Sequence, residues 1–423
     1  EKDKKWEYKW RQSESDLENE FIQILKNYNW YEYVDIKTKD ELINNLREKI
    51  EKLNNIQFTD SEWRNFSDTY LFNSTHWIIQ KTDIIQKQDL FTFEFEDWTV
   101  KNLKLIDKKK MTENSFQIIN QYRSEWWLVK NRYDCTILIN WLPLVHIELK
   151  SRSKPISEAF NQIERYKKES FWSDSWLFEF IQIFIISNWT DTKYFSNTTR
   201  QERVDFQNDF KRWISSKRWT SFDFTIYWSD KDNKVIKDLN TFTKEFLTKK
   251  NLFEVLTKFS VFNEKKELMV MRPYQIQACK KILEKVRNAV DWVTQFWDIQ
   301  SWWYIWHTTW SWKTLTSFKV SQLIKENFPE IKKVVFVVDR KDLDFQTVRE
   351  YQKFEKWSVN SINNTNQLRK KLEDSNSSLI VTTIQKLSKY IINENNIKDI
   401  KNEKIVFIFD ECHRSQFWEM HRW

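Results

Sequence analysis

The sequence contains no glycine among its 423 residues, although it contains 25 tryptophans. An average protein of this length has about 30 glycines. Glycine accepts the positive φ angles of tight turns and allows the backbone to approach a ligand closely, which residues with larger side chains do not. A chain of this size without glycine therefore lacks the residue on which turns and phosphate-binding loops depend, unless another residue in the sequence stands for glycine.

Several tryptophans lie where glycine is expected. Asn140-Trp141 separates two apolar runs, and Asn-Gly is the usual hairpin turn at such a position. Asp97-Trp98, Ser175-Trp176 and Asn188-Trp189 also place tryptophan after a polar residue in turn-like contexts. We interpret most tryptophans as glycine positions, as results when a UGA codon that the cell reads as glycine is translated as tryptophan. The alternative is a truly glycine-free, tryptophan-rich protein.

Cysteine is scarce as well. Cys135, Cys279 and Cys412 show no metal-ligand spacing and fit a reducing cytosol, so we expect a cytoplasmic protein. No apolar run approaches the ~20 residues of a membrane span. No signal peptide is visible, and the start at Glu1 leaves the true N-terminus open. The 69 basic and 61 acidic residues give a net charge of +8, which favours a polyanionic partner but also fits an ordinary mixed surface.

The chain divides into two regions with different patterns. The predicted elements of the first region are a largely helical stretch at 14–56, strands at 133–139, 144–149 and 180–186, and a helix at 157–168. From Met271 onward, apolar strands alternate with amphipathic helices, which predicts a parallel α/β sheet. The strands of this second region are expected at 334–338, 379–382 and 405–409. We place the boundary between about 245 and 265 and divide the chain into domains 1–258 and 259–423.

A phosphate-binding motif opens one of the helices of the second region. It reads Thr308-Thr309-Trp310-Ser311-Trp312-Lys313-Thr314. With glycine at 310 and 312 this becomes a Walker A loop, whose backbone N–H groups face the phosphates, whose lysine reaches the β- and γ-phosphates and whose threonine binds Mg²⁺. The first glycine of the pattern would fall at His307, which departs from it. A chance Ser-x-Lys-Thr at a helix start is the alternative.

Two carboxylates follow the last predicted strand. Asp410-Glu411-Cys412-His413 comes directly after the apolar run 405–409, and carboxylates at the C-terminal end of a strand suit a nucleotide site. Asp410 is predicted to hold Mg²⁺ and Glu411 to activate the attacking water. The pair alone is a weak signal, but together with Lys313 it predicts an ATP site.

These motifs resemble those of superfamily 2 helicase-type ATPases. Arg272-Pro273-Tyr274-Gln275 resembles the segment that recognises adenine in that family, which implies that Arg272 and Gln275 bind the nucleotide. Asp339-Arg340 and Thr382-Thr383, each after a predicted strand, resemble its nucleic-acid-contacting motifs. Ordinary strand-end turns would also account for these two pairs.

The first region carries a second constellation, Asp134 followed after thirteen residues by Glu148-Leu149-Lys150. Glu148 and Lys150 lie two residues apart on a strand, so both side chains point to one face. Asp134 lies on the preceding strand, brought near by the turn at 140–143, although the register stays open. Two carboxylates can hold Mg²⁺ beside a scissile phosphate, and a lysine can orient water or stabilise developing charge. An exposed charged strand is the commoner origin of such a pattern.

The helix that follows strengthens the nuclease interpretation. Its residues 162–166 match Q-x-x-x-Y, a pattern that accompanies this nuclease class in DNA-translocating enzymes. Gln162 and Tyr166 lie about one turn apart on one helix face, although a routine amphipathic helix would show the same spacing. We therefore predict Gln162 and Tyr166 as catalytic residues beside Lys150 and the two metal-binding carboxylates, Asp134 and Glu148.

The whole constellation is similar to the restriction (motor) subunit of type I restriction-modification enzymes, from about residue 14 to the end. The resemblance is carried by 131–134, 147–150, the phosphate loop with the preceding 305–307, and 410–416. It implies an α/β fold with a PD-(D/E)xK restriction-endonuclease-like domain at 1–258 and a first RecA-like helicase lobe at 259–423. The family has a tryptophan at the position of Trp306, which implies that this tryptophan is genuine.

The resemblance also implies a function. It predicts an ATP-dependent DNA translocase joined to a Mg²⁺-dependent endonuclease that cuts unmethylated foreign double-stranded DNA, with ATP and Mg²⁺ as cofactors and modification (methyltransferase) and specificity subunits as partners. The family's second motor lobe and C-terminal helical region are not in the sequence, so we expect a fragment that is inactive alone. The alternatives are a stand-alone helicase-nuclease, a type III restriction subunit, or an inactive DNA-binding scaffold if the tryptophans are real.

Overall fold

The fold is described from a computed structural model of the chain. The residues described are 13–73, 75–126, 129–167, 177–198, 221–291, 304–306, 313–338, 351, 365–374, 379–392 and 403–410. The chain forms two compact units, Glu1–Phe262 with Lys266–Pro273, and Asn263–Lys265 with Tyr274–Trp423. Apart from Asn263–Lys265, the first unit continues to Pro273, which is beyond the predicted boundary at 258, and the assignment of the two domains stays a prediction.

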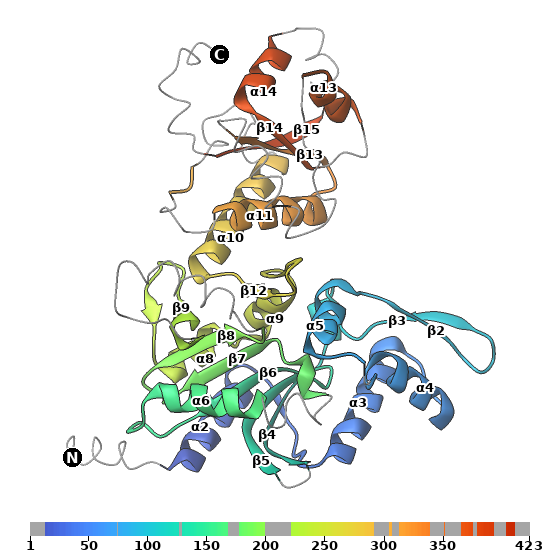
Figure 1. The fold of residues 1–423 in the computed structure, drawn as a ribbon, viewed down its shortest axis with the longest axis vertical. Coiled ribbons are helices and arrows are strands. Elements are labelled where there is room, and N and C mark those ends of the chain that lie inside the picture. Colours follow the sequence, from blue (N-terminus) through green and yellow to red (C-terminus); the bar gives the residue numbers. More distant parts are fainter. Residues whose placement is uncertain are drawn as a thin grey trace. The chain divides into compact units, whose positions relative to one another are not determined.

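A six-stranded mixed sheet forms the centre of the first unit (Figure 1). Its strands, in spatial order, are β1 (Glu32–Tyr33), β4 (Phe116–Trp126), β5 (Val129–Ile139), β6 (Leu142–Leu149), β7 (Ile183–Ser187) and β8 (Thr192–Ser196). β4, β5 and β6 are antiparallel neighbours, while β7 joins β6 in parallel. Every residue of β6 and β7 is buried, as is typical of central strands covered on both faces.

Two helices pack against this sheet near the end of β6. α6 (Ile156–Tyr166) contacts β6 and β7, and α2 (Glu14–Asn27) contacts β1 and β6. The buried residues of α6 are Ala159, Phe160, Ile163 and Tyr166, which is the spacing of one apolar helix face. The sheet and the two helices thus bring segments more than 100 residues apart in the sequence to one place.

Capping boxes fix the starts of three helices in the first unit. α2, α3 (Lys39–Asn54) and α4 (Asp60–Tyr70) follow Ser13, Thr38 and Thr59, each of which accepts a hydrogen bond from the backbone N–H three residues on. In each helix the acidic side chain at that third position returns a bond to the backbone of the cap residue. Such a cap stabilises a helix by about 1 kcal/mol.

An aromatic cluster joins α4 to the hairpin of β2 (Phe91–Glu94) and β3 (Val100–Leu103). The ring of Phe58 lies 5.3 Å from that of Phe66 and 5.7 Å from that of Phe93. The remaining elements of this unit are α5 (Ile78–Lys87), η1 (Met111–Glu113), η3 (Phe178–Phe180), η4 (Ser221–Phe224), β9 (Trp228–Ser229), β10 (Val235–Ile236), α8 (Leu239–Glu245), α9 (Lys249–Thr257), β11 (Ser260–Phe262) and β12 (Leu268–Val270). Across the described ranges, no helix combines the length and the apolar character that a membrane crossing requires.

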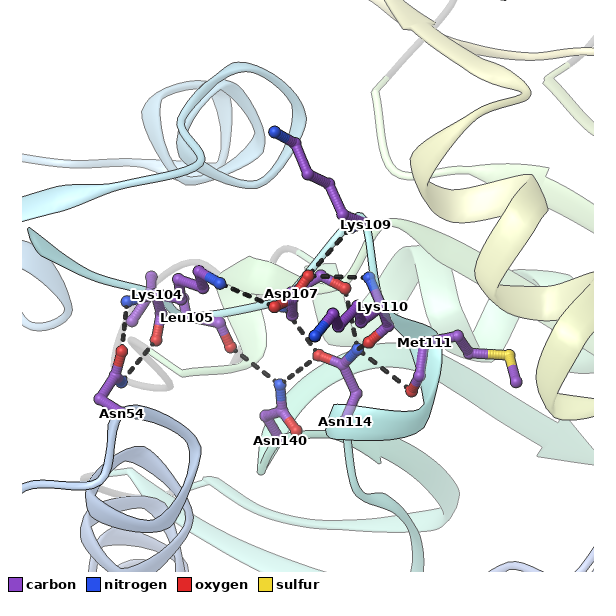
Figure 2. A network of polar contacts seen from close by, with 9 residues as sticks. All are labelled: Asn54, Lys104, Leu105, Asp107, Lys109, Lys110, Met111, Asn114 and Asn140. Carbon is purple, nitrogen blue, oxygen red and sulfur yellow. Dashed lines mark hydrogen bonds and ion pairs between the residues drawn. The ribbon is translucent and has the colours of Figure 1, made fainter. Parts of the chain in front are cut away.

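A polar network around Asp107 orders the loop that leads into β4 (Figure 2). The Asp107 carboxylate accepts hydrogen bonds from the backbone N–H groups of Lys109 (3.0 Å) and Lys110 (2.8 Å). Asn114 accepts a bond from the Asp107 backbone (2.9 Å) and another from the Asn140 amide (2.7 Å). The network therefore ties this lysine-bearing loop to the turn between β5 and β6, at the start of β6.

The second unit contains a parallel sheet in the order β14 (Leu379–Thr383), β13 (Ile331–Val338) and β15 (Lys404–Phe409), as far as its residues are described. Its helices within those ranges are α10 (Pro273–Val290), α11 (Lys313–Asn327), α13 (Thr365–Glu373) and α14 (Ile384–Ile391). The parallel sheet predicted from alternating strands and helices is confirmed.

The largely helical stretch predicted at 14–56 is confirmed, because α2 and α3 cover most of it, with the short strand β1 between them. One predicted strand of the first unit was wrong in extent. The strand predicted at 180–186 begins only at Ile183, because Phe178–Phe180 forms a 3₁₀ turn. A continuous apolar run carries no periodicity that would distinguish a buried turn from a buried strand.

Four tryptophans have backbone φ angles in the left-handed region: Trp30 (59°), Trp98 (64°), Trp141 (77°) and Trp189 (73°). Residues with a Cβ atom avoid this region, and glycine occupies it readily. In the turn between β5 and β6, Asn140 (49°) and Trp141 both have positive φ, as a type I′ turn of the Asn-Gly kind requires. The backbone favours glycine at these positions.

The side chain of Trp141 is in conflict with its surroundings as well. It is fully buried, and its indole Nε1 has no hydrogen-bond partner among the described residues. Such a buried, unpaired N–H costs about 1–3 kcal/mol, and a left-handed non-glycine residue about 1–2 kcal/mol. Trp63 differs, because it lies inside α4 and its ring is 5.8 Å from that of Phe58. The other predicted turn, Ser175-Trp176, lies outside the described residues.

We predict that protein purified from its native host carries glycine at 141, 189, 310 and 312, and tryptophan at 306. The backbone requires glycine at the first two positions, and phosphate must meet backbone N–H groups at the next two. Peptide mass spectrometry of these segments measures the outcome directly. Native peptides with tryptophan at 141 and 189 would contradict the codon interpretation, and a peptide covering Trp63 serves as the control.

Candidate functional site

The structure fixes the register that the sequence left open. Cys135 on β5 pairs with Ile147 on β6, so the next residues along the two strands, Asp134 and Glu148, lie across from each other. The backbone N–H of Leu149 donates to the Asp134 carboxylate at 2.9 Å, which holds that side chain at the end of β6. The two predicted metal-binding carboxylates therefore meet at one point of the sheet.

Lys150 completes this group. Its Nζ donates to Glu148 Oε1 at 2.8 Å, and both side chains are almost wholly buried. Burial works against a charge on Lys150, but the carboxylates of Glu148 and Asp134 outweigh it and raise the pKa of the ammonium group. Lys150 therefore stays protonated beside the carboxylates, with a charge available for a phosphate or a water molecule.

The two carboxylates are poorly solvated. Burial raises the pKa of Glu148 to about 7, against the opposing charge of Lys150. Burial, followed by the charge of Glu148, raises the pKa of Asp134 to about 7. One ammonium group is thus too little positive charge for two buried carboxylates, and a further cation would be favoured between them.

The residues present offer Mg²⁺ a buried carboxylate oxygen but few protein ligands. Glu148 Oε2 is buried and accepts no hydrogen bond from the described residues, which leaves a buried oxygen for a cation. No group of three or more His, Cys, Asp or Glu side chains that could hold a metal ion is found within the described ranges. Two carboxylates are nevertheless enough for Mg²⁺, which usually keeps several waters and uses oxygens of the substrate phosphate.

A pocket of about 640 Å³ opens beside these residues. Its lining is polar and comes from α2, β5, the loop after β6, and α6: Glu14, Asn131, Arg132, Asp134, Lys150, Lys154, Glu158, Asn161, Gln162, Arg165 and Tyr166. Four of these side chains are basic and three are acidic, and the basic ones suit an anionic backbone entering next to the carboxylates.

Gln162 and Tyr166 both line this pocket; Tyr166 bonds α6 to the sheet, and Gln162 holds the Tyr166 hydroxyl. The Tyr166 hydroxyl donates to the backbone carbonyl of Arg132 at 2.8 Å, and the Gln162 amide donates to the same hydroxyl at 2.5 Å. Burial raises the pKa of Tyr166 well above its ordinary value, so the hydroxyl keeps its proton. This geometry gives the pair an anchoring role, and the predicted catalytic role stays a prediction.

The predicted nucleotide residues of the second unit are only partly described. Lys313 and Thr314 open α11, as a Walker A lysine and threonine would. Asp410 follows β15, and its backbone N–H donates to Val337 on β13 at 2.9 Å. The predicted residues Thr308, Thr309, Trp310, Ser311, Trp312 and Glu411 lie outside the described residues.

The other predicted nucleotide residues lie near the start of α10. Gln275 is buried on its first turn, and Arg272 directly precedes the helix and is exposed. Thr383, from the pair Thr382-Thr383, caps α14 by accepting from the N–H of Lys386 at 3.4 Å. Asp339-Arg340 lies outside the described residues. The arrangement of this second group as one site stays a prediction.

The two units match two families. Residues 11–203 match the N terminus of the type I restriction enzyme R protein, and residues 274–423 match the SWI2/SNF2 ATPase. The endonuclease subunit of type I restriction enzyme EcoprrI from Escherichia coli is 43% identical over 279 residues, which are 66% of this chain and 83% of that protein. The chain belongs to the type I restriction enzyme endonuclease subunits. This confirms the family that the motifs resembled.

Comparison with longer relatives shows what share of their length this chain covers. The SsaAORF53P endonuclease subunit of Staphylococcus saprophyticus is 42% identical over 418 residues, and the SauMSSORF170P endonuclease subunit of Staphylococcus aureus is 40% identical over 418 residues. In both comparisons the match covers 97% of this chain and 41% of the relative. The chain thus spans about two-fifths of the length of these curated relatives.

Sequence analysis of this type I subunit missed Glu14, which comes to the site from α2. Glu14 Oε1 accepts hydrogen bonds from the Lys154 Nζ (3.0 Å) and the Ser151 N–H (3.3 Å). Burial works against its charge, but Lys154 and Lys150 outweigh burial and lower its pKa, so Glu14 stays ionised. Glu14 lies more than 100 residues before the motif, and no local signal connects the two. Arg132 was quoted within the motif 131–134 but was not predicted as a site residue.

We predict that the affinity of the first unit for Mn²⁺ or Mg²⁺ falls below about pH 7. Asp134 and Glu148 both have a pKa of about 7, so at lower pH a bound proton must leave before the metal binds. The expected loss is roughly tenfold per pH unit for each proton released. Calorimetric titration of Mn²⁺ at about pH 6 and about pH 8 measures it.

The same shifts predict the opposite trend for stability without metal. Between about pH 4 and pH 7 the folded state binds more protons than the unfolded state, so the free energy of unfolding should fall as pH rises. Asp134→Asn should make this slope shallower. A metal affinity that is equal at the two pH values, or a slope that Asp134→Asn leaves unchanged, would show that these carboxylates do not titrate as described.

Proposed function

We propose that the intact protein is an ATP-dependent DNA translocase joined to a Mg²⁺-dependent endonuclease that cuts unmethylated foreign DNA. The convergence of Asp134, Glu148 and Lys150 at one end of β6 carries this proposal, because two carboxylates and a lysine at a polar pocket with further basic side chains suit phosphodiester hydrolysis. The first unit would be of the PD-(D/E)xK type and the second a first RecA-like motor lobe.

In the proposed nuclease, each site residue has a distinct role. Asp134 and Glu148 would hold Mg²⁺, which supplies Lewis-acid stabilisation of the phosphate and lowers the pKa of a bound water. Lys150 keeps its proton at Nζ and would orient the attacking water or stabilise charge that develops on the phosphate. Arg132 and Arg165 at the pocket would bind neighbouring phosphates. Gln162 and Tyr166 hold α6 beside them.

In the proposed motor, ATP lies at the start of α11. Lys313 would contact the β- and γ-phosphates, Thr314 and Asp410 would hold Mg²⁺, and Glu411 would activate water. Arg272 and Gln275 would recognise the adenine, and 308–312 would surround the phosphates. The match of 274–423 to the SWI2/SNF2 ATPase supports ATP as the nucleotide.

The partners follow from the family. Relatives of this chain are named as endonuclease subunits of type I restriction enzymes, which supports assembly with modification and specificity subunits on double-stranded DNA. We propose that this assembly acts in the cytoplasm.

The two chemistries should separate in the full-length subunit assembled with its partners. Glu148→Gln and Lys150→Ala should each reduce DNA cutting by roughly 100-fold or more and leave DNA-stimulated ATP hydrolysis unchanged, since each removes a group from the nuclease site alone. Lys313→Ala should abolish hydrolysis, and with it translocation-dependent cutting. Plasmid cleavage and phosphate release are the two measurements.

These variants also test the assignments against each other. Cutting at the normal rate by Lys150→Ala would remove the nuclease assignment, and normal hydrolysis by Lys313→Ala would remove Lys313 from the ATP site. Thr241→Ala replaces an exposed residue on the first turn of α8, is the control and should change neither activity.

The basic side chains of the pocket predict a second, independent result. Arg132→Ala should weaken DNA binding in the absence of Mg²⁺ and reduce the slope of log K against log salt by about 1, because one phosphate contact is lost. Lys109→Ala removes an exposed lysine near the opposite end of β6 and is the control (Figure 2). Equal salt slopes for the Arg132→Ala and Lys109→Ala variants would show that DNA does not enter through this pocket.

A further inference from the structure

One residue of the first unit has a left-handed backbone inside a strand. Gln121 has a φ angle of 52° and lies within β4. The other described residues with positive φ lie in turns, in loops or at a helix end. Glycine and asparagine accept this conformation more readily than glutamine does, so contacts with the rest of the structure must hold Gln121 in it.

Strand pairing places Gln121 opposite a residue of the nuclease site. β4 and β5 pair in one register from Phe116 to Trp126, and in this register Gln121 lies across from Asp134. The paired positions continue on both sides of this point but pass over it. Since Asp134 lies across from Glu148 on the next strand, the three residues follow one another across β4, β5 and β6.

Contacts from α2 and from the segment around β1 hold this part of β4. The Gln121 amide donates to Glu18 Oε2, and the neighbouring Asn120 amide donates to Glu18 Oε1. The side-chain oxygen of Asn120 accepts from the Tyr33 hydroxyl (3.0 Å) and from Lys37 Nζ (3.0 Å). Lys37 Nζ also donates to the Asn120 backbone carbonyl at 2.6 Å. The carboxylate of the buried Glu18 thus binds both amides, and the left-handed backbone is fixed from two sides.

The left-handed conformation has a consequence for Asp134. In a regular antiparallel pair, directly opposite residues have Cβ atoms about 4.5–5.5 Å apart on one face of the sheet. A side chain in that position would stand beside the Asp134 carboxylate and occupy space that a cation with its bound waters needs. At Gln121 the backbone departs from this geometry, and the side chain is bonded to Glu18 instead.

We propose that Gln121 is a positioning residue of the nuclease, whose left-handed backbone turns its side chain to Glu18 and keeps the space beside the Asp134 carboxylate open for the divalent cation. The proposal rests on the assignment of Asp134 and Glu148 as metal-binding residues. Strained backbone of this kind persists where the surrounding structure imposes it, and it is concentrated at functional sites.

Two variants separate the backbone conformation from the amide contact. Gln121→Asn and Gln121→Val both lose the bond to Glu18, because asparagine is shorter and valine has no amide. Asparagine accepts the left-handed conformation, whereas β-branched valine favours a regular strand. We expect Gln121→Asn to bind Mn²⁺ within about threefold of the unmodified protein and Gln121→Val to bind it roughly 10- to 100-fold more weakly. The measurement is calorimetric titration of the full-length subunit without DNA at about pH 8.

A second pair of variants tests the conformation without metal. Gln121→Gly and Gln121→Ala both lack the amide, but only glycine accepts a positive φ angle without steric cost. The thermal midpoint of Gln121→Gly should therefore be higher than that of Gln121→Ala by roughly 2–4 °C. A regular strand would give the opposite order, because glycine destabilises strand interiors relative to alanine.

Cleavage measurements complete the test. For Gln121→Val the Mg²⁺ concentration giving half-maximal cleavage should rise by the same factor as the Mn²⁺ dissociation constant, while ATP hydrolysis matches that of Gln121→Asn. Equal Mn²⁺ affinity for Gln121→Asn and Gln121→Val, or a midpoint of Gln121→Ala at or above that of Gln121→Gly, would overturn the proposal. If Glu148→Gln binds Mn²⁺ as tightly as the unmodified protein, the metal assignment fails instead, and the two failures are thereby distinguished.

Discussion

Asp134 and Glu148 lie across from each other on neighbouring strands, and Lys150 is the one cation bonded to either of them among the described contacts of this group. Bringing two carboxylates out of water against each other is unfavourable, as the raised pKa of both shows. The remainder of the first unit must supply the energy that holds them there. The fully buried strands β6 and β7 do so, since apolar burial on both faces stabilises the sheet regardless of what its end carries.

The anchors of the site come from distant parts of the chain. Tyr166 binds the backbone of Arg132, and Glu14 reaches Lys154 from a helix 140 residues earlier. The first contact joins α6 to β5, the second joins α2 to the loop after β6, and all four residues line the pocket. These contacts hold the helices in place around the charged side chains. A site that binds a divalent cation and a phosphate together needs side chains held in this way.

Sequence patterns were sufficient for the features that depend on local spacing. The two-residue period placed Glu148 and Lys150 on one face, the Asn140-Trp141 pair identified the turn, and the alternation of strands and helices identified the parallel sheet. Long-range geometry was beyond such patterns. The pairing of Asp134 with Glu148 depends on register, and the place of Glu14 in the site depends on contacts that neither spacing nor composition encodes. The start of the strand predicted at 180–186 was wrong because a buried apolar run without periodicity fits a turn and a strand equally.

The left-handed tryptophans have a consequence for the gene as well as for the protein. A turn requires a positive φ angle whichever amino acid a translation table assigns to the codon. The positive φ angles at these tryptophans therefore indicate that the ribosome inserts glycine there. In a cell with a different codon assignment, this gene would yield a defective product, and a functional product would be confined to hosts that share the reassignment. The genetic code would then limit horizontal transfer of the gene. The φ angles of a structure would indicate which codon assignment its gene requires.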